Sequence, residues 1–212
     1  MRVAIHQPGY LPWVGFFSKV YQADVLVLLD TVEYSHGGYT NRVSLPDLWL
    51  TVPCRASSDS LISEVRIVPG RWTRKHKATL LQRYGEIARP VVNNLGLSED
   101  LTTHNTLLIH TLLGQLGLQR RVVLASEIEI DTPESPSVRL LYLVQAVGGK
   151  TYLSGLGARK YLDTSPFLQA GIDVVAVVPP EASSHSILHE IGTRGVAATS
   201  DLLRTSEVLP WS

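Results

Sequence analysis

The sequence is poor in the features that mark several large protein classes. Cys54 is its single cysteine in 212 residues, so a disulfide framework is excluded. Lys plus Arg and Asp plus Glu each number 19, and the resulting formal net charge of zero argues against broad nucleic-acid binding. Charged residues make up 18% and hydrophobic residues 44%, a balance that excludes an intrinsically disordered chain.

Long hydrophobic runs are also missing. No run exceeds five residues, the length of the one at residues 25–29, and this is far short of the roughly 20 residues that span a bilayer. The N-terminal apolar run breaks at His6 and is too short for the core of a secretory signal. We therefore expect a cytoplasmic protein without a membrane span, and the lone Cys54 fits a reducing compartment.

Sequence patterns for metal binding and for common nucleophiles are not found. Neither H-E-x-x-H nor C-x-x-C occurs. His185 and His189 are four residues apart, but no carboxylate motif accompanies them, so we predict no metal site. G-x-S-x-G and P-loop motifs are absent too. Cys54 follows Pro53 in a strand-like segment, which favours a core residue over a nucleophile.

What the chain does contain is an alternation of short apolar runs with amphipathic segments. Strands are predicted at residues 2–5, 25–30, 121–125, 151–153 and 173–178. Helices are predicted at 14–22, 72–84, 101–116, 131–147, 155–162 and 196–205, the fourth of them opening at Asp131-Thr132-Pro133. The strands are continuously apolar, which indicates a sheet covered on both faces.

This order predicts an α/β fold of the three-layer Rossmann-like type, with a mainly parallel sheet flanked by helices. We expect one domain over residues 1–212. Within it, residues 43–70 are predicted to be a small β insertion with a hairpin, and residues 72–116 a helical segment. In such folds, ligands bind beyond the C-terminal ends of the parallel strands.

Polar residues follow three of the predicted strands. His6 and Gln7 come after the first, Asp30 ends the second, and Ser154 and Gly155 follow the strand at 151–153. These residues fall where the strand-end rule expects a binding site.

The first polar segment, residues 5–17, reads IHQPGYLPWVGFF. A histidine such as His6 at a strand end can act as a base or donate to an anionic oxygen. Gln7 can read an amide or a hydroxyl, and Tyr10 and Trp13 add aromatic contacts to a turn made rigid by two prolines. The alternative is a structural His6 that bonds a backbone carbonyl, and the residues leave both open.

The second polar segment, residues 30–42, holds candidates for orienting and binding. Asp30 can orient an imidazole, and Arg42 can grip a carboxylate or phosphate through two hydrogen bonds. Tyr34 and Asn41 can shape a pocket. The alternative is that Asp30 caps a turn and that Asn41 and Arg42 form a solvated strand entrance.

Two further segments are candidates for anion binding. Lys75 and His76 lie in a basic helix start, which opposes the helix dipole unless an anion offsets it, although a solvated surface explains it equally. Ser154 and Gly155 open a strand–turn–helix with free backbone N–H groups, and Arg159 adds charge. Glycine alone is weak evidence there, since tight turns need it anyway.

Taken together, these segments resemble the WbqC-like family. The resemblance rests on IHQPxYLPWxGFF at 5–17, Asn41-Arg42, Trp72-x-x-Lys75-His76 and YLSGxGxxxYL at 152–162, in the family's order. It implies a bacterial transferase that moves an acyl or aminoacyl group, glycyl included, in surface-polysaccharide or specialised-metabolite biosynthesis. The acceptor group is a hydroxyl or an amine. The donor is a small molecule, a carrier-linked compound or aminoacyl-tRNA, and the resemblance does not decide whether ATP is the activating cofactor.

Within this hypothesis His6 is the base or an oxyanion contact, oriented by Asp30 or Gln7. Two alternatives remain. The layout is also similar to that of nucleotidyltransferases of the H-I-G-H type, with Tyr10 and Trp13 about where that motif has its histidines, which makes ATP-dependent adenylyl transfer one alternative. The other is a non-catalytic module that binds a carrier- or nucleotide-linked intermediate.

Overall fold

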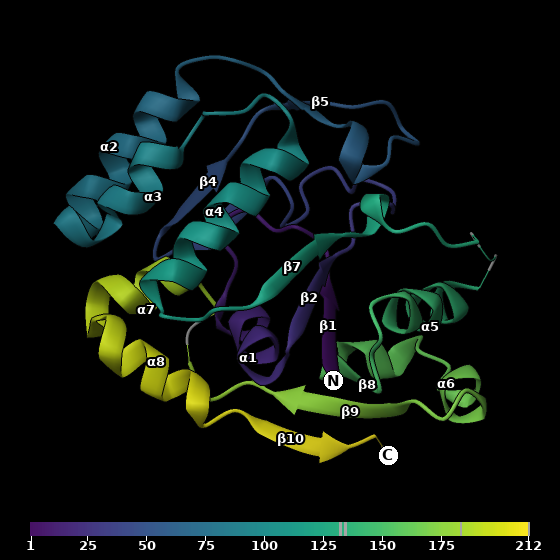
Figure 1. Ribbon diagram of the computed structural model, residues 1–212. Coiled ribbons are helices and arrows are strands. Elements are labelled where there is room, and N and C mark those ends of the chain that lie inside the picture. The colour runs from purple at the N-terminus through teal and green to yellow at the C-terminus, as the bar shows by residue number, and fades with distance from the viewer. Residues whose placement is uncertain (132, 134, 183, 212) are drawn as a thin grey trace.

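A mostly parallel sheet forms the centre of the molecule (Figure 1). The computed structural model describes residues 1–131, 133, 135–182 and 184–211. Across these residues the strand order is β10-β9-β8-β1-β2-β7. The strands are β1 (Arg2–His6), β2 (Val25–Leu28), β7 (Arg121–Leu124), β8 (Thr151–Gly155), β9 (Asp173–Val178) and β10 (Glu207–Pro210). Only β10 runs antiparallel to its neighbour.

The order of the parallel strands is doubly wound. From β1 the chain builds outward through β2 to β7, then returns to the other side of β1 and builds through β8 to β9. The direction of winding therefore reverses between β1 and β8, which is the place where ligands bind in folds of this type. His6 and Gly155, the last residues of these two strands, lie at the same edge of the sheet.

Helices cover both faces of the sheet. One face packs against α1 (Val14–Gln22), α4 (Leu101–Gln115), α7 (Ile187–Arg194) and α8 (Val196–Arg204), and the other against α5 (Pro136–Ala146) and α6 (Ser165–Gln169) (Figure 1). Side chains alternate along β1, so that Ala4 joins the first core cluster while Val3 and Ile5 join the second. The predicted three-layer Rossmann-like α/β fold is confirmed.

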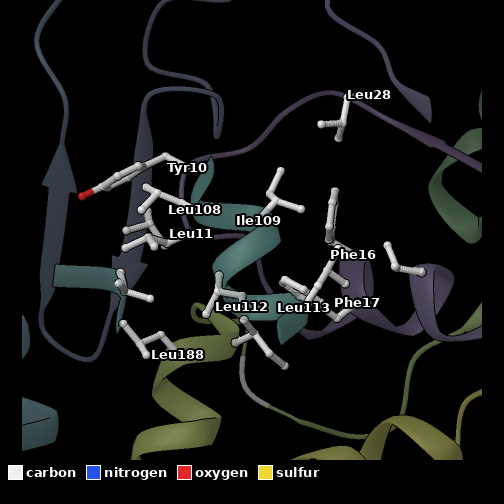
Figure 2. Close-up of a cluster of buried hydrophobic side chains, with 14 of the residues drawn as sticks. Tyr10, Leu11, Phe16, Phe17, Leu28, Leu108, Ile109, Leu112, Leu113 and Leu188 are labelled. Atoms are coloured by element: carbon white, nitrogen blue, oxygen red, sulfur yellow. The ribbon is translucent and has the colours of Figure 1, made fainter. Parts of the chain in front are cut away.

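The larger core cluster explains why α1 and α4 form where they do. Phe16 and Phe17 of α1 meet leucines and an isoleucine of α4 over Leu28 of β2, with Leu188 of α7 at the far end (Figure 2). The predicted apolar stripe of the 101–116 helix is fully buried, since Leu108 and Leu112 have no exposed surface. None of the helices in the described part of the chain is long and apolar enough to cross a membrane.

The expected β insertion consists of two small sheets rather than one hairpin. β3 (Arg42–Leu45) and β4 (Leu48–Thr51) form a hairpin, whose turn places Asp47 at φ 61°. β5 (Cys54–Arg55) and β6 (Arg66–Ile67) pair separately, around the short turn η1 (Ile62–Glu64). The expected helical segment follows as α2 (Trp72–Tyr84), η2 (Gly85–Ala88), α3 (Arg89–Asn94) and α4.

Two sequence predictions need correction. Residues 155–162 form a 3₁₀ turn, η4 (Leu156–Lys160), instead of an α-helix. α5 begins at Pro136 rather than near Asp131, because Ser135 caps it by accepting a hydrogen bond from the Val138 N–H at 3.5 Å. Thr132, which belonged to the predicted helix start, lies outside the described residues. The elements α3, α6, α7 and β10 were not predicted, and each is short.

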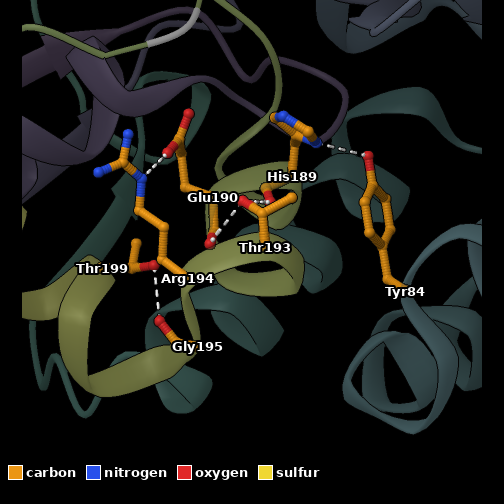
Figure 3. A network of polar contacts seen from close by, with 7 residues as sticks. All are labelled: Tyr84, His189, Glu190, Thr193, Arg194, Gly195 and Thr199. Carbon is orange, nitrogen blue, oxygen red and sulfur yellow. Dashed lines mark hydrogen bonds and ion pairs between the residues drawn. The ribbon is translucent and has the colours of Figure 1, made fainter.

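A polar contact joins α7 to α2, and an ion pair lies within α7 (Figure 3). The Tyr84 hydroxyl of α2 and Nδ1 of His189 are 3.1 Å apart, and Arg194 donates to Glu190 at 2.6 Å. Gly195 joins α7 to α8 at φ 85°, a backbone conformation that favours glycine. His189 and His185, considered above as a metal pair, have other partners, since Nδ1 of His185 lies 3.1 Å from the Ser44 hydroxyl. Nowhere in residues 1–131, 133, 135–182 and 184–211 do three ligand-type side chains gather as a metal site.

Candidate functional site

A pocket of about 580 Å³ opens at the edge of the sheet where β1 and β8 end. Four parts of the chain line it: the end of β1, α1 with the loop before it, α5, and β8 with the turn after it. The lining residues are, in that order, His6 and Gln7; Trp13, Gly15 and Lys19; Arg139; and Tyr152, Ser154, Gly155 and Gly157. This is the reversal point of the sheet, and the volume is typical of a small-molecule site. The structure therefore brings together five of the predicted site residues: His6, Gln7, Trp13, Ser154 and Gly155.

The charge of the pocket has one sign. Lys19 and Arg139 line it, and neither Asp nor Glu is among its described lining residues. Arg139 Nε is buried and has no hydrogen-bond partner in the described chain, and its Nη1 donates only weakly, to the Thr31 carbonyl at 3.5 Å. Most of the remaining wall is apolar. The pocket is therefore suited to a compound with an anionic group on an apolar body.

His6 is held as a neutral imidazole. Its Nδ1 lies 3.0 Å from the Gln7 carbonyl oxygen, which only accepts, so the proton is on Nδ1 and Nε2 carries the lone pair. The ring packs edge-on against Phe16, with the centroids 5.0 Å apart. Burial, and then the nearby Lys19 ammonium, lower the pKa of His6 to about 3. At neutral pH the ring accepts hydrogen bonds through Nε2 without carrying charge.

Lys19 reaches the same pocket from α1. It follows Gly15 by one helical turn, which places both residues on one face of the helix. Burial lowers the pKa of the Lys19 ammonium to about 8. The part of the chain that the structure describes offers it no hydrogen bond or ion pair.

The β8 side of the pocket is open because two residues lack side chains. Gly155 has φ −91° and ψ 157°, an extended conformation that any residue adopts. A Cβ atom placed on Gly155 or Gly157 meets no atom within 4 Å. Neither backbone geometry nor packing requires glycine here. The five-residue η4 does not supply the α-helix N-terminus that the predicted anion site at Ser154 and Gly155 assumed.

Aromatic side chains border the pocket. Trp13 is 41% exposed and its ring folds back over Gly15, where an added Cβ would lie 2.4 Å from the ring. Tyr161, which also lines the pocket, is 70% exposed. Tyr152 is buried and stacked on Phe167 with centroids 5.4 Å apart, and burial raises its pKa, so it stays protonated. The entrance can thus cover an apolar or ring-shaped ligand.

Asp30 lies outside this pocket. Its two carboxylate oxygens accept from the Ser126 backbone N–H at 2.9 Å and from the Ser126 hydroxyl at 2.6 Å. The side chain is almost fully buried and joins the end of β2 to η3 (Ala125–Glu127). The orienting contact to His6 comes instead from the carbonyl of Gln7.

Tyr10 and His76 also lie elsewhere, in a buried aromatic cluster. The Tyr10 hydroxyl and His76 Nδ1 are 2.9 Å apart, and Trp72 and His104 pack around them. Burial, followed by the proximity of His104, lowers the pKa of His76 to about 4, so it is neutral and fixes α2 to the loop after β1. Lys75 is exposed on α2 and does not line the pocket.

The other predicted residues have structural partners of their own. Tyr34 is buried next to Cys54, and burial raises the pKa of both, that of Cys54 to about 11. Asn41 Nδ2 donates to the Val52 carbonyl at 2.9 Å. The Arg42 guanidinium lies 4.5 Å from the Trp49 ring centroid, and that of Arg159 lies 5.9 Å from the Trp211 ring centroid.

Sequence reasoning missed Lys19, Arg139, Tyr152 and Tyr161 as pocket residues. The two cations share one signal. Lys19 is the single charged residue of α1, and Arg139 is the single charged residue of α5. A lone cation on a helix is usually a solvated side chain, so this signal does not by itself place either residue in a pocket.

Comparison with known proteins places the chain in a family. The model of the WbqC-like protein family matches residues 7–183, a range that includes Gln7, both pocket cations and the β8 wall. The Uncharacterized protein Rv1507c of Mycobacterium tuberculosis (strain ATCC 25618 / H37Rv) is 27% identical over 187 residues, which are 82% of this chain and 80% of that protein. No solved structure matches the chain. The chain belongs to the WbqC-like protein family.

Proposed function

We propose that the pocket is the active site of a transferase that moves an acyl or aminoacyl group, glycyl included, to a hydroxyl or amine acceptor. One observation carries the proposal. A neutral imidazole with an unprotonated Nε2 lies in a pocket that holds two cations and no carboxylate among its described lining residues. Such a pocket accepts an anionic donor and still offers a proton acceptor beside it.

The donor side of the pocket is the cationic side. Arg139, with its buried and unpaired Nε, binds a carboxylate or phosphate of the donor. Gly155 and Gly157 let the donor approach the backbone closely, and Trp13 covers its apolar part. The donor is a small molecule or a carrier-linked compound, aminoacyl-tRNA included, and family membership supports a biosynthetic role in surface-polysaccharide or specialised metabolism.

His6 supplies the proton transfer. The acceptor oxygen or nitrogen attacks the acyl carbon, its proton moves to Nε2 of His6, the bond to the leaving group breaks, and the proton passes to that group. Attack makes an amine acceptor strongly acidic, so a weak base suffices. An anionic donor beside Lys19 also removes one cause of the low pKa of His6, so that the pKa rises when the donor is bound.

The experiment compares His6→Ala with His110→Ala, an exposed histidine on α4 outside the pocket. Acyl transfer is measured with thioester, acyl-phosphate and aminoacyl-tRNA donors and a panel of amines and alcohols. We expect His6→Ala to lose about a hundredfold or more in turnover while donor affinity is kept, and His110→Ala to behave as wild type. Normal turnover by His6→Ala contradicts the proposal, and loss of affinity alone favours a non-catalytic binding module.

A second candidate is adenylyl transfer, favoured by the location of the pocket at the reversal point of a doubly wound sheet, where nucleotides bind. The turn after β1 argues against it, because Pro8 has no N–H and no glycine-rich phosphate loop follows. Amino-acid-dependent exchange between ATP and pyrophosphate decides the matter. Exchange supports this candidate, and its absence with a broad amino-acid panel contradicts it.

A further inference from the structure

Lys19 is the one lysine that lines the pocket. The others are Lys75, Lys77, Lys150 and Lys160, none of them a pocket residue. Lys19 is half-buried in a mainly apolar wall, close enough to His6 for the two to interact electrostatically. A lysine that leaves water normally gains a carboxylate partner, and the described pocket residues include none.

The environment of Lys19 favours the free amine. Burial lowers its pKa to about 8, so about one molecule in ten carries the neutral amine at pH 7. A desolvated lysine in an apolar pocket is a typical amine nucleophile toward carbonyl compounds. The groups around it complete the requirements of that chemistry. Arg139 is free to hold an anion, and Nε2 of His6 is free to accept a proton.

We propose that Lys19 forms an imine with an aldehyde or ketone that carries a carboxylate or phosphate and is held in the pocket by Arg139. This goes beyond acyl transfer and does not depend on it, since the reacting nitrogen belongs to the protein. The two share only the pocket and the preference for an anionic compound.

The step balances without an oxidant or reductant. The Lys19 Nζ lone pair attacks the carbonyl carbon, a C–N bond forms, and the carbonyl π electrons move to oxygen. The nitrogen loses a proton to Nε2 of His6, which returns it to the oxygen. The C–O bond then breaks, the oxygen leaves as water with a second proton drawn from the nitrogen, and the C=N bond forms. The sum is one amine plus one carbonyl giving one imine plus one water.

The experiment uses the full chain and two probes, glyoxylate as an anionic aldehyde and acetaldehyde as a neutral one. Imines are fixed with cyanoborohydride, and the labelling rate at each lysine is read by peptide mass spectrometry. We expect glyoxylate to label Lys19 at least tenfold faster than Lys75 or Lys150 at neutral pH, because about one Lys19 side chain in ten is a free amine there and because Arg139 holds the aldehyde in the same pocket. Equal or slower labelling of Lys19 overturns the proposal.

Two variants separate imine formation from general reactivity. Lys19→Arg keeps the charge and removes the nucleophile, so we expect its label to vanish while the other lysines react as in wild type. Arg139→Gln is expected to slow the reaction of Lys19 with glyoxylate and to leave its reaction with acetaldehyde unchanged. The circular dichroism spectrum of this variant is compared with that of wild type to show that both are folded. An unchanged glyoxylate rate in Arg139→Gln refutes the anionic anchor. Since trapping needs no acyl donor, its failure is distinguishable from a failure of the transfer assay.

Discussion

Replacing Gly155 tests whether the β8 wall is part of the ligand space. An alanine there adopts the observed φ −91° and ψ 157° without strain, and its Cβ meets no atom within 4 Å. The substitution therefore acts mainly on the unfolded chain, because alanine allows it fewer backbone conformations than glycine does. This raises the free energy of unfolding by about 0.4–1 kcal/mol. For a chain of this size the midpoint of thermal unfolding rises by about 1–4 °C.

The larger substitution Gly155→Val then fills the open space beside β8 with a side chain that the observed backbone conformation accepts. We expect it to unfold no earlier than wild type and to slow glyoxylate labelling of Lys19. Gly114→Ala is the matched control, because Gly114 also has free space around its Cα but lies on α4 outside this pocket. A loss of more than about 1 kcal/mol in Gly155→Ala would show that the wall is closed. Wild-type labelling in Gly155→Val would show that ligands do not reach it.

Three further predictions concern the surroundings of the pocket. The pKa of His76 is about 4 in the folded protein and near 6.5 in the unfolded chain, so the unfolded chain binds a proton more readily as the pH falls. The contribution of His76 to the free energy of unfolding is therefore complete above about pH 6.5 and lower by about 3 kcal/mol at pH 4. Urea unfolding at both pH values checks this, and equal stability at the two contradicts it. The added methyl group of Gly15→Ala must displace the Trp13 ring. We expect a changed tryptophan fluorescence spectrum and faster labelling of Lys19 by acetaldehyde, and an unchanged spectrum and rate would refute the contact between Trp13 and Gly15. Asp30→Ala removes both buried hydrogen bonds to Ser126 and is expected to cost about 1–3 kcal/mol in chemical unfolding, while Lys19 labelling stays as in wild type; slowed labelling would show that Asp30 acts on the pocket.

The strands and the place of the pocket were predictable because they depend on local pattern. The run Val25–Leu28 is buried on both faces, as its continuous apolar character indicated. His6, Gln7 and Ser154 were found by their position after strands, since parallel strands bring their carboxyl ends to one edge. One domain and a cytoplasmic location stay predictions.

The partners of the polar residues were not predictable, because they are far apart in the chain. Asp30 meets Ser126, 96 residues away, and Tyr10 meets His76, 66 residues away. A strand-end carboxylate looks the same in sequence whether it faces a ligand or a serine. Lys19 was hidden for a related reason, since only the packed α1 shows which of its faces turns toward the pocket.

The most direct measurement of the central claim is native mass spectrometry of the protein after incubation with a bacterial metabolite extract. We predict one retained anionic compound per chain in wild type, and its loss in both Arg139→Ala and Gly155→Val, which change pocket residues from two different elements, α5 and β8. Retention of the same compound by both variants would contradict the account. So would a retained ligand without an anionic group.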